Sequence, residues 1–220
     1  MTELVTLIDS EEAAQDWLRA RPEGTPEVME RLGALIAMLA EENKVQNLVS
    51  AASLEAVWQR HIVDSAQLLA HVPRGTVSPW LDLGTGAGFP GLVIAALRPD
   101  ARVVMVESRA RRIEWLTRVC ERLGLAQAEV VGQRLELVES ETVAVISARA
   151  FAPLDRLLSL SARFSTKDTI WLLPKGRSAA QELAALKKGW LHMFHVEPSL
   201  TDTDAGIIVG NLNGTPKVKR

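Results

Sequence analysis

Hydrophobic and polar positions follow two different patterns along the chain, and the pattern changes near residue 72. Up to that point, apolar residues recur at the spacing of an α-helix, as Leu32, Leu35 and Leu39 do. The spacing predicts three helices, over residues 11–20, 25–43 and 53–72. Thr25 and Ser53 are the expected N-caps of the second and third helices, because their hydroxyls can accept hydrogen bonds from a first helical turn.

From residue 80 onwards, short apolar runs of strand length alternate with segments of helical spacing. The runs expected to form strands are PWLDLG, ARVVMVE, AEVVG, TVAVIS, TIWLLPK, LHMFHV and AGIIVGNL. Such alternation predicts a doubly wound, mostly parallel α/β sheet. Only the last two runs lack a helix between them, so they are predicted to close the sheet as an antiparallel hairpin. Residues 71–79 mark the expected boundary between an N-terminal helical cap, residues 1–72, and a sheet domain, residues 73–220.

The composition is that of a soluble globular protein. No apolar run approaches the roughly 20 residues that a membrane-spanning helix needs, and the N-terminus lacks the basic segment and cleavage site of a secretion signal. Cys120 is the single cysteine, which excludes a disulfide within the chain and a cysteine metal cluster. We therefore expect a cytoplasmic, monomeric protein that contacts neither metal nor membrane.

Charge is unevenly distributed along the chain, and the distribution bears on possible partners. Residues 1–30 contain eight carboxylates and two arginines, a local charge of −6, so the remaining 190 residues carry +4 because the whole chain carries −2. The body of the protein can therefore accommodate a polyanion such as RNA while the acidic N-terminal segment stays in solvent.

The stretch LDLGTGAGFPGL, residues 81–92, predicts a nucleoside site. Gly84, Gly86 and Gly88 let the backbone turn tightly and approach a ligand without a β-carbon in the way. The loop follows the first strand, where open parallel sheets bind their ligands. Glu107 ends the next strand, where its carboxylate can accept hydrogen bonds from two ribose hydroxyls.

Two kinds of nucleoside ligand match this loop. Residues 86–91 also fit the pattern G-x-G-x-x-G of dinucleotide sites, so an NAD-dependent oxidoreductase stays open. Asp82, just before the loop, would repel a pyrophosphate and attract a cationic ligand such as S-adenosylmethionine. One such ion pair contributes roughly 4 kcal/mol at about 4 Å and an effective dielectric constant of about 20. The loop therefore favours S-adenosylmethionine as the cofactor.

The segment after the fourth predicted strand, ARAFAPLDRLL, indicates the kind of acceptor. Class I methyltransferases place the acceptor chemistry here, and the sequence has neither the Asn/Asp-Pro-Pro-aromatic motif of amino-group methylation nor a Pro-Cys nucleophile for cytosine. Arg149 stands there instead. A lone pair that carries no proton, such as guanine N7, needs no general base, because positioning alone can contribute about 7 to 11 kcal/mol.

Seven short motifs then resemble, in order and spacing, one known family. They are NLVS, WQRHIVDS, LDLGTGAGFPGL, ESRARRIEWL, GQRLE, SARAFAPLDRLL and LLPKG, and they extend from Asn47 to Gly176. The family is the type G group of small-subunit rRNA guanine-N7 methyltransferases. The resemblance implies a class I, Rossmann-like methyltransferase fold with an N-terminal helical cap, S-adenosylmethionine as the cofactor, and 16S rRNA or the small ribosomal subunit as the partner.

The resemblance also implies roles for individual residues. By motif matching, the residues that would bind the methyl donor are Gly84, Gly86, Gly88 and Glu107. Those that would line the pocket or contact RNA are Asn47, His61, Arg134 and Arg149.

Position along the chain adds further candidates. Arg134 and Arg149 follow strand ends on the active face and are the expected catalytic residues, with Arg149 also near the cofactor. Asp82 and Phe89 belong to the glycine-loop region and are expected to contact the cofactor. Further cations expected to contact RNA are Arg109, Arg111, Arg112, Lys175 and the tail KVKR, residues 217–220.

Several of these residues also have purely structural interpretations. His61 can be a hydrogen-bonding helix residue, and Asn47 can brace the junction between cap and sheet. Arg60 and Asp64 stand four apart, the spacing of a surface ion pair that contributes about 0.3 to 0.5 kcal/mol. At the level of function, a protein that senses the nucleoside and binds RNA without transferring a methyl group stays open beside the oxidoreductase.

Overall fold

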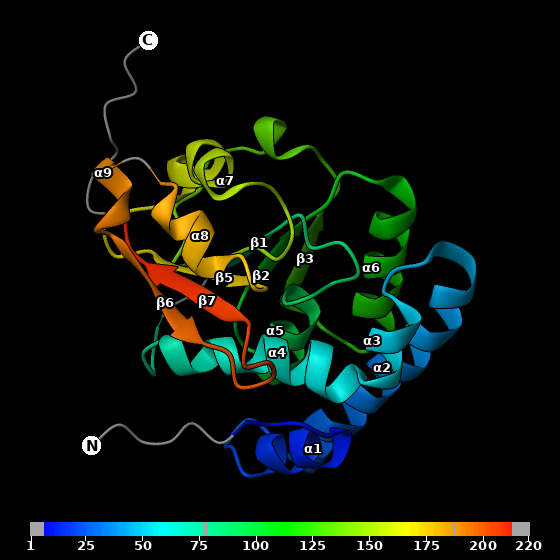
Figure 1. Ribbon diagram of the computed structural model, residues 1–220. Coiled ribbons are helices and arrows are strands. Elements are labelled where there is room, and N and C mark those ends of the chain that lie inside the picture. The colour runs from blue at the N-terminus through cyan, green and yellow to red at the C-terminus, as the bar shows by residue number, and fades with distance from the viewer. Residues whose placement is uncertain (1–6, 77–78, 187, 213–220) are drawn as a thin grey trace.

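A seven-stranded sheet organises the part of the chain that this computed structural model describes, residues 7–76, 79–186 and 188–212. The strands lie in the order β3-β2-β1-β4-β5-β7-β6 (Figure 1). Pairing is parallel from β3 to β5, whereas β7 is antiparallel to both β5 and β6. The strands are β1 (Trp80–Leu83), β2 (Val103–Val106), β3 (Ala128–Val131), β4 (Val145–Ser147), β5 (Ile170–Lys175), β6 (Phe194–Pro198) and β7 (Gly206–Gly210).

The strand predictions are confirmed, including the closing hairpin of β6 and β7. The α-helices are α1 (Glu11–Arg19), α2 (Pro26–Gln46), α3 (Ala51–Glu55), α4 (Asp64–Ala66), α5 (Gly91–Leu97), α6 (Ala110–Arg122), α7 (Leu154–Ser161), α8 (Ala179–Ala184) and α9 (Lys188–Leu191). Segments of other helix types are the π-helix η1 (Trp58–Val63) and the 3₁₀-helices η2 (Gln67–His71), η3 (Leu135–Leu137) and η4 (Ala162–Phe164). The tail at 217–220 and residues 77–78 of the expected boundary lie outside the described residues.

The third predicted helix, over residues 53–72, is not continuous. Ser53 is not its cap, because Ser50 precedes the helix and accepts the hydrogen bond of the Ser53 N–H at 3.2 Å. The α-helix α3 ends after Glu55, and η1 then continues as a π-helix. The Glu11 carboxylate accepts the Trp58 and Gln59 N–H groups at 3.0 and 2.8 Å, which satisfies donors that the break would leave free.

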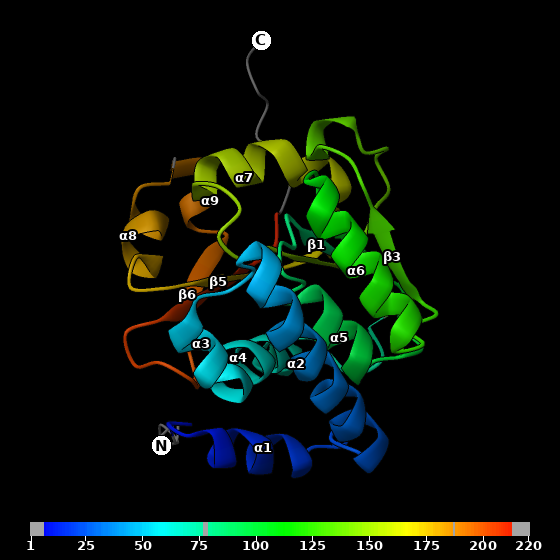
Figure 2. The same ribbon diagram turned by 90° about the vertical axis from the view of Figure 1, so that its right-hand side faces the viewer.

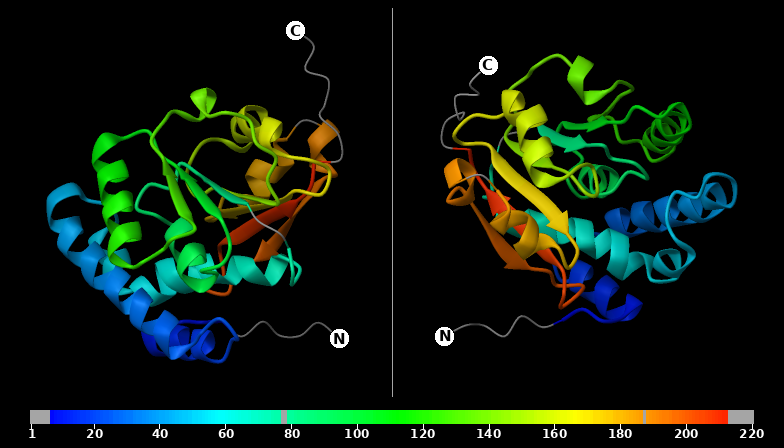
Figure 3. Two further views of the ribbon diagram at one scale, coloured as in Figure 1. Left: turned by 180° about the vertical axis from the view of Figure 1, so that it is seen from behind. Right: turned by 45° about the horizontal axis from the view of Figure 1, so that its top comes forward.

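Glu11 departs from the expectation that the acidic N-terminal segment stays in solvent, whereas Asp9, Glu12, Asp16, Glu27 and Glu30 are exposed. The Glu11 carboxylate is half-buried and accepts N–H groups of the helical segment 47 and 48 positions further along the chain. The Ile8 N–H donates to the Leu200 carbonyl at 2.8 Å, so the segment also contacts the loop between β6 and β7. Figure 3 shows this loop reaching the N-terminal helices.

The two faces of the sheet are covered by different helices. Alternate residues of β1 and β2 place Trp80 and Met105 in a cluster with side chains of α2, α5 and α6, while Leu83 and Val106 pack with α7 and α8. Figure 2 shows α2, α5 and α6 beside one another. Cap and sheet share the first cluster, and each fully buried leucine in it contributes about 1.5–3 kcal/mol. None of the helices in the described residues has the length and apolar character to cross a bilayer.

Candidate active site

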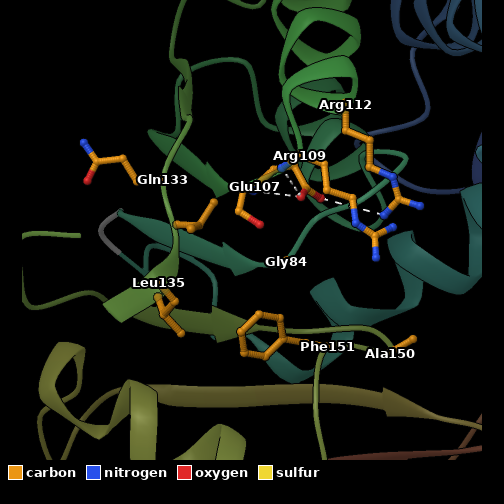
Figure 4. A pocket seen from close by; sticks show the side chains of 10 residues that line it. Gly84, Glu107, Arg109, Arg112, Gln133, Leu135, Ala150 and Phe151 are labelled. Atoms are coloured by element: carbon orange, nitrogen blue, oxygen red, sulfur yellow. Dashed lines mark hydrogen bonds and ion pairs between the residues drawn. The ribbon is translucent and has the colours of Figure 1, made fainter. Parts of the chain in front are cut away.

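The strand order reverses between β1 and β4, and two hollows open at the carboxyl ends of the strands around this switch point. The first, here named the Glu107 pocket, is shown in Figure 4. Its lining comes from Gly84 after β1, Val106 and Glu107 at the end of β2, Ser108, Arg109 and Arg112 at the start of α6, Gln133 and Leu135 after β3, and Ala150 and Phe151 after β4.

The glycine loop contributes Gly84 to the lining of this pocket, whereas Gly86 and Gly88 lie outside the lining. The loop needs its glycines for two reasons. Gly84, Gly86 and Gly88 have φ values of 62°, 62° and 102°, a region that side chains other than glycine rarely adopt. A β-carbon on Gly84 would overlap the ring of Phe151, and one on Gly88 would overlap Leu92. The backbone conformation therefore favours glycine at all three positions, and a close neighbouring side chain also requires it at Gly84 and Gly88.

Glu107 is buried and held by three backbone N–H groups. Its Oε2 accepts from Gly86 at 3.1 Å, and its Oε1 accepts from Ser108 at 2.7 Å and Arg109 at 2.9 Å. The guanidinium of Arg112 lies 3.9 Å from Oε2. Because an ionised carboxylate has about four acceptor positions, one position remains for a ligand without the loss of a backbone contact.

Asp82 lies behind the glycine loop and does not line the Glu107 pocket. It is fully buried, and its carboxylate accepts from the Ser147 hydroxyl at 2.8 Å and the Gly91 N–H at 3.0 Å. Burial raises the pKa of this carboxyl, while those hydrogen bonds oppose the rise. The structure thus gives Asp82 a role in joining β1, β4 and the start of α5, and its contact with a cofactor stays a prediction.

The second hollow, here named the Arg149 cleft, lies between η1, the end of β5 and the β6–β7 loop. Its lining includes His61, Asp64, Arg149, Lys175, Ser199 and Asp202. The Arg149 guanidinium donates to the His61 Nδ1 at 3.1 Å, to the Arg60 carbonyl at 3.3 Å and to the Asp64 carboxylate at 3.4 Å. Arg149 is therefore held by the N-terminal cap.

His61 is neutral and joins three parts of the site. Burial, then the charges of Arg149 and Arg60, lowers its pKa to about 3. Because arginine can only donate, Nδ1 is the acceptor for Arg149 and Nε2 donates to the Ser53 hydroxyl at 3.1 Å. The imidazole also stacks on Phe89, with ring centres 4.7 Å apart. Phe89 is 2% exposed and does not line the Glu107 pocket.

The prediction of an ion pair between Arg60 and Asp64 is wrong. Arg60 pairs with Asp202 at 3.0 Å, and Asp64 pairs with Arg149 at 3.4 Å. The physical reason is the π-helical turn η1, which is wider than an α-helix, so that residues four apart no longer face each other as an α-helix would place them.

The other predicted site residues are dispersed. Lys175 lines the cleft, but its ammonium pairs with Glu182 at 2.8 Å and its side chain is 8% exposed. Arg134 is 73% exposed and lies 3.8 Å from Glu136. Arg111 is exposed at the start of α6, and Asn47 is an exposed C-cap of α2 with a φ of 43°. The structure thus brings together Glu107 with Arg109 and Arg112, and His61 with Arg149, but leaves these four outside both groups of contacts.

Sequence reasoning missed six residues of the Glu107 pocket: Val106, Ser108, Gln133, Leu135, Ala150 and Phe151. Val106 ends β2, and the other five follow β2, β3 or β4 by two to four positions, so position at or just after a strand end was the signal that could have found them. Phe151 is the aromatic side chain that faces this pocket (Figure 4). Ala150 precedes it with a φ of 53°, so the backbone turns sharply to place the ring against Gly84.

Comparisons with known proteins point to one family. The model for rRNA small subunit methyltransferase G matches residues 28–204. The Erythrobacter litoralis protein named ribosomal RNA small subunit methyltransferase G is 56% identical over 204 residues, which cover 93% of this chain and 97% of that protein. The protein of the same name from Novosphingobium aromaticivorans is 57% identical over 210 residues, covering 94% and 90%.

Solved structures of methyltransferases share the fold. An RNA methyltransferase from Salinibacter ruber in complex with S-adenosyl-L-homocysteine has a TM-score of 0.51 at 16% identity, covering 71% of this chain and 94% of that one. A methyltransferase from Geobacter sulfurreducens has a TM-score of 0.57 at 14% identity, covering 81% and 90%. The predicted class I fold is confirmed. The alternative of an NAD-dependent oxidoreductase is wrong, because the sequence relatives are methyltransferases. The chain belongs to the rRNA small subunit methyltransferase G family.

Proposed function

We propose that this protein transfers the methyl group of S-adenosylmethionine to N7 of a guanine in 16S rRNA. The observation that carries the proposal is the placement of Gly84, the first residue of the glycine loop, and Glu107 in one pocket at the switch point, with Arg149 following the adjacent strand β4. In this proposal the protein is a cytoplasmic monomer that needs no metal, and its substrate is the rRNA or the small ribosomal subunit.

The residues of the Glu107 pocket fit the donor. Glu107 has one acceptor position left for a ribose hydroxyl, and Gly84 lines the pocket without a side chain. When bound, S-adenosylmethionine supplies an electrophilic methyl group on a sulfonium. The cavity of about 210 Å³ is smaller than the roughly 300–1,000 Å³ usual for a small-molecule site. The ring of Phe151 would therefore turn away from Gly84 to admit the whole donor.

The acceptor side fits a base that needs no deprotonation. His61 is neutral, but its Nδ1 is already occupied by Arg149, so it is badly placed to remove a proton. Guanine N7 carries no proton, and its reaction requires only that the base be held in line with the methyl group. Arg149 would orient the base, while exposed Arg109, Arg111 and Arg134 would contact phosphate. The guanine must first leave its stack to reach the pocket.

The test is single-turnover transfer of radiolabelled methyl to small subunits that lack the modification, followed by chemical mapping of N7-methylguanine. Gly86→Asp should abolish donor binding, because the position has a φ of 62° and its β-carbon would lie 3.3 Å from Arg112. Gly124→Asp is the matched control, since Gly124 has a φ of 63° and open space around it, far from the pocket lining.

Label at a single guanine, lost in Gly86→Asp and kept in Gly124→Asp, supports the proposal. Donor binding without transfer to any RNA would contradict it and would revive the nucleoside-sensing protein. Label on an adenine or on a guanine exocyclic amine would contradict the N7 assignment alone.

A further inference from the structure

The Arg149 guanidinium is held by three acceptors, and only one of them is charged. The Arg60 carbonyl and the neutral His61 Nδ1 fix its place, whereas the Asp64 carboxylate also compensates its charge. The Arg149 and Asp64 side chains are only 24% and 20% exposed, so solvent screens their attraction less than it would at the surface. Of the five N–H groups of a guanidinium, these contacts occupy three and leave two for a ligand.

Asp64 is itself held in one orientation by two further donors. Its Oδ1 accepts from the Gln67 side chain at 3.1 Å and from the Thr201 hydroxyl at 3.1 Å, which turns Oδ2 towards Arg149. Thr201 belongs to the loop between β6 and β7 and is 3% exposed. A chain of contacts therefore leads from Thr201 in this loop through Asp64 to Arg149. Thr201 and Asp64 are 137 positions apart in the sequence, and Asp64 and Arg149 are 85 positions apart.

We propose that Asp64 is a positioning residue for the methyl acceptor, held by Thr201 and acting through the Arg149 guanidinium. The inference rests on the proposed function, because Arg149 orients the acceptor there. Asp64 does not need to touch the RNA. Its carboxylate fixes the plane of the guanidinium, so that the two remaining N–H groups face the Arg149 cleft.

A general role of the β6–β7 loop in packing against the cap is the competing explanation. Arg60 pairs with Asp202 in the same loop at 3.0 Å, and Gln59 donates to the Thr201 carbonyl at 3.1 Å. Both contacts join the same two segments as Asp64 and Thr201 do. Arg60 also contacts Arg149 through its carbonyl, and Asp202 lines the Arg149 cleft, whereas Gln59 is not part of the cleft lining. Gln59→Met, which removes the donor to the Thr201 carbonyl, is therefore a control that weakens the attachment of the loop and spares the proposed path.

The experiment is a double-mutant cycle of Asp64→Asn and Arg149→Ala, with single-turnover methyl transfer to unmodified small subunits and calorimetric binding of S-adenosylmethionine as readouts. Asp64→Asn keeps the shape of the side chain and removes its charge. We expect it to slow transfer about 10- to 100-fold, the range for loss of one charge-assisted hydrogen bond. Donor affinity should stay within about twofold, because Asp64 lies outside the Glu107 pocket.

In the Arg149→Ala background, Asp64→Asn should change the rate by less than about twofold, since the group it orients is gone. Gln59→Met should leave the rate within about twofold of the wild type in either background. Thr201→Val, which keeps the volume and removes the donor to Asp64, provides a milder variant if Asp64→Asn does not fold, and it should also lose its effect when Arg149 is alanine.

Equal slowing by Asp64→Asn with and without Arg149 would overturn the positioning role and assign Asp64 to the packing of the loop. The same conclusion follows if Gln59→Met slows transfer as much as Asp64→Asn does. A wild-type protein that transfers no methyl group overturns the proposed function and this inference together, so the two failures are distinguishable.

Discussion

The Glu107 pocket and the Arg149 cleft are held together in opposite ways. The Glu107 carboxylate is fixed by backbone N–H groups 1, 2 and 21 positions away, all between the loop after β1 and the start of α6. Arg149 is fixed by groups 85 to 89 positions away, on a different part of the chain. The carboxylate of the proposed donor side is thus held by local contacts, whereas the contacts of Arg149 on the acceptor side form only when the cap and the sheet have assembled and the β6–β7 loop has packed against them.

The largest effect that would test this contrast is expected from Glu107→Gln. Glutamine offers one oxygen and an NH₂ group where three backbone N–H groups now point at a carboxylate, so at least one donor would be unsatisfied. We expect the Kd for S-adenosylmethionine to rise about 100-fold, from the loss of charge-assisted hydrogen bonds. Glu141→Gln, at an exposed carboxylate, is the control. Unchanged donor affinity in titration calorimetry would show that Glu107 is not part of the donor site.

Arg149→Lys sharpens the contrast from the other side. A lysine keeps the positive charge but cannot reach three acceptors in a fixed plane. Methyl transfer should slow about 10- to 100-fold in single-turnover assays, with donor affinity within about twofold. A fall in donor affinity as large as the fall in rate would mean that the two regions are one functional unit and that the contrast is wrong.

Phe151→Leu and Phe89→Leu form a matched pair that assigns the aromatic contact of the donor. Phe151 faces the Glu107 pocket, whereas Phe89 is buried under His61. We expect Phe151→Leu to weaken donor binding about fivefold, corresponding to about 1 kcal/mol of lost contact. Phe89→Leu should lower the free energy of unfolding with little change in donor binding. The reverse pattern would return Phe89 to the cofactor site that the sequence suggested.

The smallest expected effect concerns the pH dependence of stability. The pKa of His61 is lowered from 6.5 to about 3 in the folded protein, so the unfolded chain takes up the proton first as the pH falls. The stabilisation by neutral His61 is complete above about pH 6.5 and is lost progressively towards pH 3. Between pH 7 and 5.5 this amounts to about 1 kcal/mol. The free energy of unfolding can be measured by urea titration at several pH values. Its dependence on pH should be shallower in His61→Gln than in the control His195→Gln, which alters an exposed side chain.

The same contrast explains which features could be predicted from sequence. One short segment contains Gly84, Gly86, Gly88 and Glu107. Its glycines indicate the backbone conformation, and its carboxylate indicates an acceptor for hydrogen bonds. The strands were readable because their apolar runs are short and bounded by turns. The partner of Asp64 could not be predicted, because it depends on the π-helical turn η1 and on a strand end 85 positions later. Phe151 was missed because its place in the pocket depends on the positive φ of Ala150, which nothing in that residue type signals.

The carboxylate of Glu11, which accepts the Trp58 and Gln59 N–H groups, has a practical consequence for anyone who shortens or tags this protein. It joins α1 to the segment that contains His61 and Asp64. Trimming the chain to residue 12 for crystallisation would remove this anchor from the acceptor side and leave the glycine loop untouched. We expect such a shortened protein to bind the cofactor normally and to transfer the methyl group slowly. A cofactor-binding assay alone would therefore not detect the damage.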